Sequence, residues 1–464
     1  MHPYTENGYY FINMANVIKL KKGLDIKLQG KAAEERMSLK SSGKYALVPD
    51  DFEGVVPKVV VKEGDMVKAG EALFVNKQYP EMKFASPVSG RVTAVERGER
   101  RKVLCVKVEA DKEQTFVDYG KPNMEKMDGK QVLGHIMEAG LLGYINQLPY
   151  AIATIPDQPR TIFVSALRDK PLACDFEYEV KGQEQDFVTG LKALAKIAKV
   201  HVGVGKESGL MSHISNLEGV EVTVFDGPCP AGNVGVQVNN LEPVNKGEMV
   251  WAIGDPTVVL FIGRLFNTGK VDLRRLVALC GSEVTKPCHV EMLVGQELQT
   301  LLANSYDQDH HVRIINGNVL TGSQTTKDGY LAAHASEVTV IPEGDDADEL
   351  LGWAMPRMKE FSVNRSYFSW LFGKKKEYAL DARVKGGERH IIMSGEYDRV
   401  LPMDIYGEYL VKAIITGDID KMEQLGIYEV SPEDFALAEF VDSSKLELQR
   451  IVREGLNNLR KENA

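Results

Sequence analysis

Residues 54–109 constrain the fold of this chain more than any other stretch, because they contain two half-repeats of one short pattern. The first half runs over residues 54–65 and the second over residues 90–99. Each half is a run of β-branched residues closed by a glycine-containing turn, and segments of this kind form hairpins. The pattern predicts a small β-sandwich built from two similar halves.

The same pattern resembles the barrel of lipoyl- and biotinyl-carrying domains, in which a modified lysine sits at a hairpin tip. In those domains the lysine precedes by eight residues the proline of a Ser/Ala-Pro-x-x-Gly turn, which here is Pro87. The corresponding residue in this chain is Tyr79. Lys83 is expected inside a strand, and Lys77 is also off the tip position. The pattern therefore predicts an unmodified structural barrel.

Size, composition and charge define the class of protein. A chain of 464 residues is too long for one hydrophobic core, so several domains are expected. The content of 44% hydrophobic and 26% charged residues is that of an ordinary soluble globular protein. The formal net charge of −10 argues against a nucleic-acid partner, because phosphate binding needs a concentrated basic surface.

The cysteines predict neither disulfides nor a metal site. They are scattered without a Cys-x-x-Cys motif, a pattern that fits a reducing compartment. Cys280, Cys288 and His289 come nearest to a metal-binding set, but their spacing matches no structural zinc pattern. The cysteines are Cys105, Cys174, Cys229, Cys280 and Cys288.

The chain is not expected to cross a membrane by itself. Its longest apolar-leaning run, residues 250–263, is shorter than the roughly 20 residues that span a bilayer. The N-terminus has no basic region followed by an apolar region and a cleavage site, so no export signal is expected. Met14 is a candidate for the natural start.

The order of patterns along the chain predicts a multidomain α/β and α+β protein. Strands and helices alternate from residue 161 onward, and Ser431 followed by Pro432 predicts a helix start in the C-terminal part. Six segments are expected: an N-terminal extension and first strand (1–37), a barrel-sandwich hybrid (38–112), a helical connector (113–160), a Rossmann-like α/β domain (161–283), a β-grasp, SLBB-like domain (284–345), and a C-terminal hairpin and helical domain (346–464).

A glycine-punctuated loop at residues 201–209 follows an expected strand and precedes an expected helix. Its spacing is Gly-x-Gly-x-x-x-Gly, which differs from the dinucleotide-binding fingerprint. Glycines at strand ends usually serve only the turn, so the loop is interpreted as structural.

Four segments carry a resemblance to a known family: residues 19–32, 227–235, 381–414 and 445–456. The chain resembles the C subunit of Rnf electron-transport complexes and the flavoprotein subunit of respiratory complex I. It is most similar to the NqrA family of sodium-translocating NADH:quinone reductases. The resemblance covers nearly all of the chain from Met14 onward, and the match over residues 381–414 is specific.

In flavin-bearing relatives the connector contains consecutive glycines that let the backbone approach the flavin phosphate. In this chain, glycine positions of that loop are occupied by Ile145, Asn146 and Leu148. Their β-carbons would block such an approach, because only glycine leaves the space and adopts positive φ freely. The resemblance therefore implies a degenerate flavin loop and no bound FMN.

The same relatives hold two 4Fe–4S clusters on cysteine runs near the C-terminus. No cysteine stands at any of the eight corresponding positions, so no iron–sulfur cluster is expected, and no covalently bound cofactor either. These positions are Pro432, Phe435, Ala438 and Asp442 for one cluster, and Ile391, Ser394, Tyr397 and Leu401 for the other.

The resemblance implies a peripheral subunit on the cytoplasmic face of the bacterial inner membrane. Its partners would be the integral membrane and flavin-bearing subunits of a complex that uses NADH, quinone and Na+. The complex would be a translocase, and the isolated chain would be inactive, without catalytic residues of its own. Two alternatives stay open: a scaffold with no ligand, and a dehydrogenase component that binds FMN or NADH.

Two weaker site predictions come from local sequence. The turn at residues 227–232 offers Pro228, Pro230 and Gly232 as candidates for the wall of a quinone slot, although a plain turn is the alternative. Aromatic residues next to lysines over 367–376 are typical of a lipid-headgroup interface or a partner contact. The alternative is a hairpin whose aromatic residues pack inward. The docking candidates are Trp370, Phe372, Lys374, Lys375 and Lys376.

Overall fold

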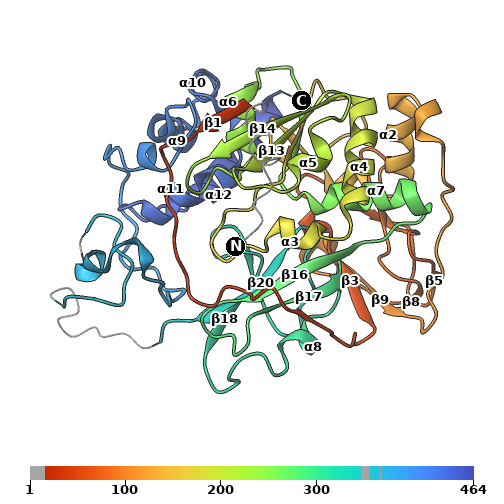
Figure 1. Ribbon diagram of the computed structural model, residues 1–464, viewed down its shortest axis with the longest axis horizontal. Coiled ribbons are helices and arrows are strands. Elements are labelled where there is room, and N and C mark those ends of the chain that lie inside the picture. Colours follow the sequence, from red (N-terminus) through yellow and green to blue (C-terminus); the bar gives the residue numbers. More distant parts are fainter. Residues whose placement is uncertain (1–15, 346–354, 366, 464) are drawn as a thin grey trace, which may run out of the picture.

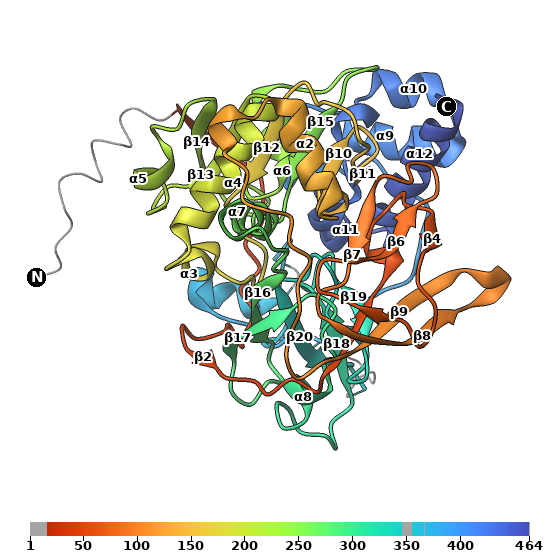
Figure 2. The same ribbon diagram turned by 90° about the vertical axis from the view of Figure 1, so that its right-hand side faces the viewer.

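The computed structural model describes residues 16–345, 355–365 and 367–463, except for the side chains of residues 373–375. Within these ranges the strands form four sheets, and most of the helices lie at one end of the molecule (Figures 1 and 2). The candidate start at Met14 lies outside the described residues.

A seven-stranded sheet has the order β1-β14-β13-β12-β15-β10-β11. The first five strands in this order, β1, β14, β13, β12 and β15, are parallel to one another. β10 then pairs antiparallel with β15, and β11 pairs antiparallel with β10. Parallel strands buried on both faces are expected to be continuously apolar, as in β12. The bounds are β1 (Asn16–Lys19), β10 (Asn146–Leu148), β11 (Ile152–Ala153), β12 (Ile162–Ser165), β13 (Val200–Gly205), β14 (Val220–Asp226) and β15 (Val250–Ile253).

Helices cover both faces of this sheet. Ile162 and Val164 share a core with α4 and α7, whereas Phe163 packs on the other face with residues of α6, as strand alternation requires. A β-carbon on Gly190 would lie 2.1 Å from the carbonyl oxygen of Val259, so glycine permits the close approach of α4 and α7. The helices are α2 (Gly129–Glu138), α3 (Phe176–Val180), α4 (Glu184–Ile197), α5 (Met211–Ile214), α6 (Val234–Leu241) and α7 (Thr257–Thr268).

A six-stranded sheet has the order β19-β18-β20-β16-β17-β2. The α/β segment was expected to extend to residue 283, but β16 pairs with β17 and β20 of this sheet. Val277 and Leu279 explain this pairing, because they are buried in the core of the six-stranded sheet. The elements are β2 (Arg36–Met37), β16 (Arg274–Cys280), β17 (Cys288–Leu293), α8 (Gln299–Leu302), β18 (Val312–Asn316), β19 (Ser323–Thr325) and β20 (Glu337–Pro342).

Two small sheets, β3-β9-β8-β5 and β4-β6-β7, form the barrel-sandwich predicted from the half-repeats. Tyr79 lies in the turn between β6 and β7, and Lys83 begins β7, as the sequence predicts. The bounds are β3 (Lys44–Leu47), η1 (Pro49–Asp51), β4 (Pro57–Val59), β5 (Met66–Val67), β6 (Ala72–Asn76), β7 (Lys83–Ala85), β8 (Gly90–Arg97), η2 (Glu99–Arg101), β9 (Val103–Ala110), and the linking 3-10 turns η3 (Met124–Lys126) and η4 (Leu142–Tyr144).

The C-terminal part is a cluster of short helices closed by α12. Ser431 forms a capping box with Asp434 at the start of η9, which confirms the predicted helix start. The elements are η6 (Phe368–Lys375), η7 (Tyr397–Arg399), α9 (Gly407–Thr416), α10 (Ile419–Gln424), η8 (Ile427–Glu429), η9 (Pro432–Phe435), α11 (Ala436–Val441) and α12 (Leu448–Glu462).

The expected hairpin after residue 366 is wrong, since its first part folds as η6. Instead of pairing with that segment, Tyr378 forms an isolated parallel bridge with Leu28 of the N-terminal segment. Residues 355–361, which precede this segment, form bends and turns and no regular helix.

Candidate functional site

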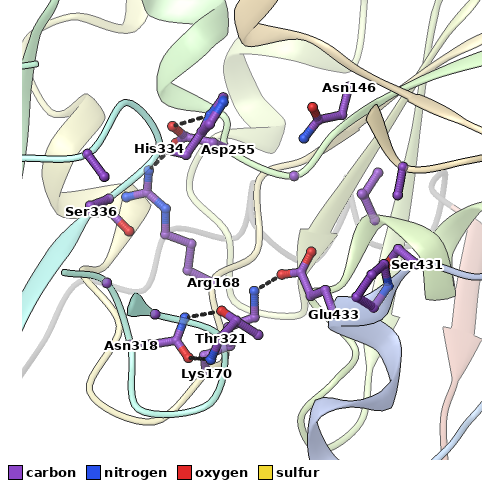
Figure 3. Close-up of a pocket in the computed structure, with 18 of the residues that line it drawn as sticks. Asn146, Arg168, Lys170, Asp255, Asn318, Thr321, His334, Ser336, Ser431 and Glu433 are labelled. Atoms are coloured by element: carbon purple, nitrogen blue, oxygen red, sulfur yellow. Dashed lines mark hydrogen bonds and ion pairs between the residues drawn. The ribbon is translucent and has the colours of Figure 1, made fainter. Parts of the chain in front are cut away.

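A cavity of about 460 Å³ is lined by residues of the barrel, of both large sheets and of the C-terminal helices (Figure 3). Its wall includes Asp51 of the barrel, Asn146 of β10, Asn318 after β18, and Glu433 of η9. Cavities of roughly 300–1,000 Å³ at domain junctions are the usual sites of small-molecule binding. This cavity is therefore the candidate site.

The seven-stranded sheet brings two charged residues to this cavity. β12 and β15 are parallel neighbours, so their carboxyl ends meet at one edge of the sheet. Arg168 follows the end of β12, and Asp255 follows the end of β15. Both line the cavity, at the edge where open α/β sheets bind their ligands.

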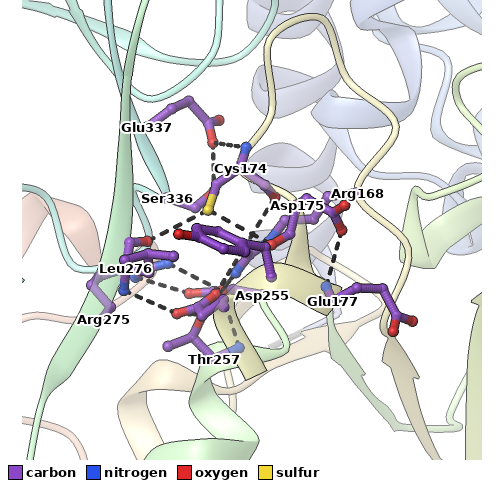
Figure 4. A network of polar contacts seen from close by, with 12 residues as sticks. Arg168, Cys174, Asp175, Glu177, Asp255, Thr257, Arg275, Leu276, Ser336 and Glu337 are labelled. Carbon is purple, nitrogen blue, oxygen red and sulfur yellow. Dashed lines mark hydrogen bonds and ion pairs between the residues drawn. The ribbon is translucent and has the colours of Figure 1, made fainter. Parts of the chain in front are cut away.

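An ion network lies under this edge (Figure 4). Arg168 Nη1 is 2.7 Å from Glu179 Oε2, and Arg168 Nη2 is 2.9 Å from Asp255 Oδ1. Arg275, which comes from β16, places its Nη1 3.0 Å from Asp255 Oδ2. Its side chain is completely buried. The network thus joins the seven-stranded sheet to the six-stranded sheet.

The network favours the charged forms of Arg168 and Asp255. Burial acts to raise the pKa of Asp255, but Arg275, His334 and Arg168 together hold this pKa well below its usual range. Burial acts to lower the pKa of Arg168, and Glu179 and Asp255 raise it above its usual value. Because these two charges compensate each other, Arg168 and Asp255 stay ionised near neutral pH at the cavity floor.

A second group joins the barrel to the cavity. Asp51 Oδ2 accepts a hydrogen bond of 2.8 Å from the backbone N–H of Ala333 in the six-stranded domain. The next residue, Phe52, meets the ring of Tyr144 edge-on at 5.1 Å and lies 6.1 Å from the ring of His334. Burial raises the pKa of Asp51 to about 6, although the Ala333 hydrogen bond and His334 oppose the rise.

Two polar atoms shielded from solvent at this cavity have neither a hydrogen-bond nor an ion-pair partner. They are the hydroxyl of Tyr144 and Oδ1 of Asp169. The other carboxylate oxygen of Asp169 accepts a 2.8 Å hydrogen bond from the N–H of Gly232. Burial raises the pKa of both side chains. An unsatisfied buried polar atom costs roughly 1–3 kcal/mol, so these atoms need an explanation such as a ligand or water.

Three family models match successive parts of the chain. The model described as the NqrA N-terminal barrel-sandwich hybrid domain matches residues 18–111. The NqrA second alpha/beta domain matches residues 127–271, and the NQRA C-terminal domain matches residues 276–327.

Curated relatives match the full chain. The A subunit of the Na(+)-translocating NADH-quinone reductase of Yersinia pestis bv. Antiqua (strain Angola) is 34% identical over 452 residues, which are 96% of this chain and 100% of the relative. The proteins of that name from Haemophilus influenzae (strain PittGG) and Neisseria meningitidis serogroup C / serotype 2a (strain ATCC 700532 / DSM 15464 / FAM18) are also 34% identical, with the same coverage. The chain belongs to the NqrA family of Na(+)-translocating NADH-quinone reductases.

Membership of the NqrA family confirms the resemblance seen in the sequence, and with it the multidomain mixed α/β architecture. Among solved structures, an NAD+-reducing NiFe-hydrogenase in the air-oxidized state is 10% identical. It covers 75% of this chain and 67% of its own, with a TM-score of 0.36, which is too low to support an argument. No helix in the described ranges is long and apolar enough to cross a membrane.

Of the three residues predicted for the quinone slot, only one lines the cavity. Gly232 lines the cavity, whereas Pro228 and Pro230 stand in the same turn but do not contribute to the cavity wall. The peptide bond before Pro230 is cis. A β-carbon at Gly232 would lie 2.4 Å from the carbonyl oxygen of Leu167, so the close approach of these two loops requires glycine.

Two of the three residues at the glycine positions of the degenerate flavin loop line the cavity. Asn146 and Leu148 line the cavity, but Ile145 is completely buried in the core and is not part of the cavity wall. The chain from 146 to 148 is the strand β10, paired with β15. A backbone held in this sheet, with a side chain at each position, fits poorly with a loop that must wrap a flavin phosphate.

None of the docking candidates lines the cavity, and two of the three whose side chains are described are exposed. Trp370 is 43% exposed and Phe372 is 53% exposed. Lys376 is half-buried, with its Nζ 4.6 Å from the centre of the Phe372 ring. The side chains of Lys374 and Lys375 lie outside the described residues. The aromatic residues that were alternatively expected to pack inward therefore face solvent at these two positions.

Residues considered for metal or cluster binding have structural roles. Cys280 and Cys288 are buried, and His289 Nδ1 lies 2.7 Å from the carbonyl oxygen of Ala33. In the part of the chain that the structure describes, no group of three His, Cys, Asp or Glu residues could hold a metal ion. At one cluster position, Asp442 accepts backbone hydrogen bonds from Ser444 and Leu446 and so closes the turn before α12.

The sequence analysis missed Arg168, Asp255, Asp51 and Tyr144. Asp255 follows a buried strand and precedes Pro256 at the start of a helix, a position at which an acidic residue is common. That signal could have drawn attention to it. The partners of these residues are distant in sequence, so nothing in the local pattern indicates the network.

Proposed function

We propose that this chain is the peripheral subunit of a membrane-bound NADH:quinone reductase that couples electron transfer to Na+ export. It docks on integral membrane and flavin-bearing subunits at the cytoplasmic face of the bacterial inner membrane. The observation that carries the proposal is the 34% identity to an NqrA-family protein over 96% of this chain and 100% of that relative's length. Proteins similar over their whole length, domain by domain, generally keep the same place in an assembly.

The finer architecture is part of the proposal. The strand order β14-β13-β12-β15 supports a Rossmann-like α/β domain, because the first three strands run outward in reverse chain order and the fourth lies on the other side of β12. The six-segment division is retained, with the β-grasp, SLBB-like domain beginning at β16. The C-terminal helices then form a domain that has kept a cluster-binding fold without cysteines.

The isolated chain carries no electrons through bound centres and is inactive alone. Its part in the reaction lies in the assembly, and NADH and Na+ are used by the whole complex. Support comes from the cavity region, where β10 occupies the place of a glycine-rich flavin loop, and from the lack of cysteine at all eight cluster positions. A dehydrogenase component that binds FMN or NADH is the weaker alternative.

The proposed contribution of this chain to quinone binding is made by residues of the cavity. A quinone head group needs an apolar slot and one or two hydrogen-bond donors. Leu148 and Leu167 supply apolar wall, and the hydroxyl of Tyr144 is a buried donor without a partner. Asp51, with a pKa of about 6, stands at the same wall as a proton source. Gly232 remains a candidate contact, while Pro228 and Pro230 can act only through the shape of their turn.

The scaffold alternative predicts that the cavity binds no quinone. Trp251 is completely buried in β15, one residue before the cavity-lining Ala252, so its fluorescence should respond to an occupied cavity. Saturable quenching by a short-chain quinone, lost in Tyr144→Phe, supports the quinone role. Linear quenching that is equal in both proteins supports the scaffold.

The test of the assembly proposal is co-purification. An affinity tag on this chain, expressed with its own membrane complex, should recover the integral membrane and flavin-bearing subunits in fixed ratio from detergent extracts. Recovery of the chain alone, with the membrane complex fully assembled without it, would contradict the proposal.

A further inference from the structure

The helix η6 exposes an unusual run of large apolar side chains. Among the first five residues of η6, four side chains are 43–62% exposed, and Ser369 is buried. Figure 1 shows this light-blue segment at the outer left edge of the molecule, away from the sheets. Single exposed apolar residues are common, but a contiguous group marks a binding surface. The exposed residues are Phe368, Trp370, Leu371 and Phe372.

Cations flank this group on both sides. The Arg365 guanidinium carbon lies 5.3 Å from the centre of the Trp370 ring, and Lys376 Nζ lies 4.6 Å from the centre of the Phe372 ring. These cation–π contacts hold positive charge beside the exposed rings. The surface thus combines aromatic rings with cations in one short segment.

The charge of this segment is opposite to that of the chain. Residues 357–376 contain six Lys and Arg residues and one acidic residue, in a chain whose net charge is −10. An anionic surface would attract this segment and repel most of the rest of the molecule. A partner with an anionic surface and an apolar layer just beneath it fits both the charge and the exposed rings.

We propose that η6 inserts into an anionic phospholipid surface, with Phe368, Trp370, Leu371 and Phe372 among the headgroups. Trp and Tyr rings favour the headgroup level of a bilayer, and basic residues beside them bind anionic lipids. The chain is thereby attached to the membrane by a contact of its own. This inference rests on the proposed function only in placing the chain next to a membrane, and it is testable without the complex.

The experiment uses the purified full chain and vesicles of phosphatidylethanolamine and phosphatidylglycerol in a 3:1 ratio. The chain is expected to sediment with these vesicles, and brominated lipids are expected to quench a tryptophan signal that Trp370→Phe removes. Binding should weaken when salt is raised from 0.05 to 0.5 M, because screening shortens the Debye length from above about 10 Å to well below it. Vesicles of phosphatidylcholine alone should bind less.

The matched variants carry two Ser substitutions each. Phe368→Ser with Leu371→Ser should weaken vesicle binding by about tenfold or more, since both side chains would be buried among lipids. The control, Val60→Ser with Met66→Ser, removes side chains that are 51% and 57% exposed on the barrel and should leave binding unchanged. Thermal unfolding of both variants checks that the fold persists.

Equal vesicle binding by the two double variants, or absence of vesicle binding by the wild type, overturns the lipid proposal. If the η6 variant instead loses only its attachment to the detergent-solubilised complex, the surface is a protein interface and the lipid proposal is also wrong. Either outcome leaves the assembly proposal standing, because co-purification with the complex is measured separately.

Discussion

Arg275 Nη1 lies 3.0 Å from Asp255 Oδ2, and this pair joins the two large sheets at the cavity floor. The arginine side chain is completely buried, and Asp255 is shared with Arg168. A buried guanidinium needs its counter-charge, because the cost of its desolvation is not otherwise repaid. The Asp255 carboxylate therefore contributes to holding the two sheets together, beside the hydrogen bond from the Leu276 N–H to Glu179.

Asp255→Asn should lower the free energy of unfolding by about 3–5 kcal/mol, because it leaves buried positive charge uncompensated. Chemical denaturation at pH 7 measures the loss. The matched control is Lys286→Gln, which breaks the exposed pair with Glu35 at 3.0 Å and should leave the free energy of unfolding nearly unchanged. Equal losses in the two variants would show that the network does not hold the sheets together.

Asp51→Asn should make the chain more stable at neutral pH. The pKa of Asp51 is raised from 3.8 to about 6 in the fold, so the folded protein binds more protons than the unfolded chain between these values. Stability from this group therefore falls as pH rises from about 4 to 6, and the ionised carboxylate costs about 3 kcal/mol above pH 6.

The measurement for Asp51 is the difference in unfolding free energy between wild type and Asp51→Asn across pH. The variant should be more stable at pH 7.5, and the difference should vanish near pH 4, where both side chains are neutral in the fold. The reverse pH trend, with the variant less stable at pH 7.5, would show that the carboxylate is stabilised by Ala333 and His334 more than it is penalised by burial.

Tyr144→Phe should raise the free energy of unfolding of the ligand-free chain by about 1 kcal/mol, because it removes a buried hydroxyl without a partner. The matched control is Tyr119→Phe, whose hydroxyl donates a 2.8 Å hydrogen bond to the carbonyl oxygen of Gly70. That variant should lose about 1 kcal/mol instead. If Tyr144→Phe also lowers the free energy of unfolding, the Tyr144 hydroxyl has a partner, such as a bound water.

The purified chain should be colourless. Asn146 and Leu148 stand where a flavin would need glycines, and none of the eight cluster positions, from Ile391 to Asp442, is cysteine. An absorption spectrum and an iron assay of the full chain, purified without oxygen, check both points. Stoichiometric flavin or iron would contradict the absence of redox centres.

The parts of the fold that sequence could predict are those with local signals. The glycine-bounded half-repeats predicted the barrel and the position of Tyr79 at its hairpin tip, and Ser431 with Pro432 predicted a helix start. The pairing of β16 with β17 and β20 could not be inferred, because a buried apolar strand fits either sheet equally well. The same holds for β1, which pairs with β14 from a distant part of the chain.

The cavity was less predictable than the fold. Gly232 was named from its turn, but Asp51, Arg168 and Asp255 meet only because segments from several domains converge. The aromatic segment was expected to form a hairpin, yet the residues form η6, and Tyr378 pairs with Leu28 instead. Long-range partners decide such short elements, and a single sequence does not contain them.

The most direct test of the account is Na+-stimulated quinone reduction in membranes from a strain that lacks this chain. Adding back the purified, colourless chain should restore both NADH-driven quinone reduction and its stimulation by Na+, in proportion to the chain bound. If the depleted membranes keep full Na+-stimulated activity, or if the added chain binds without restoring it, the chain is not a working component of such a reductase.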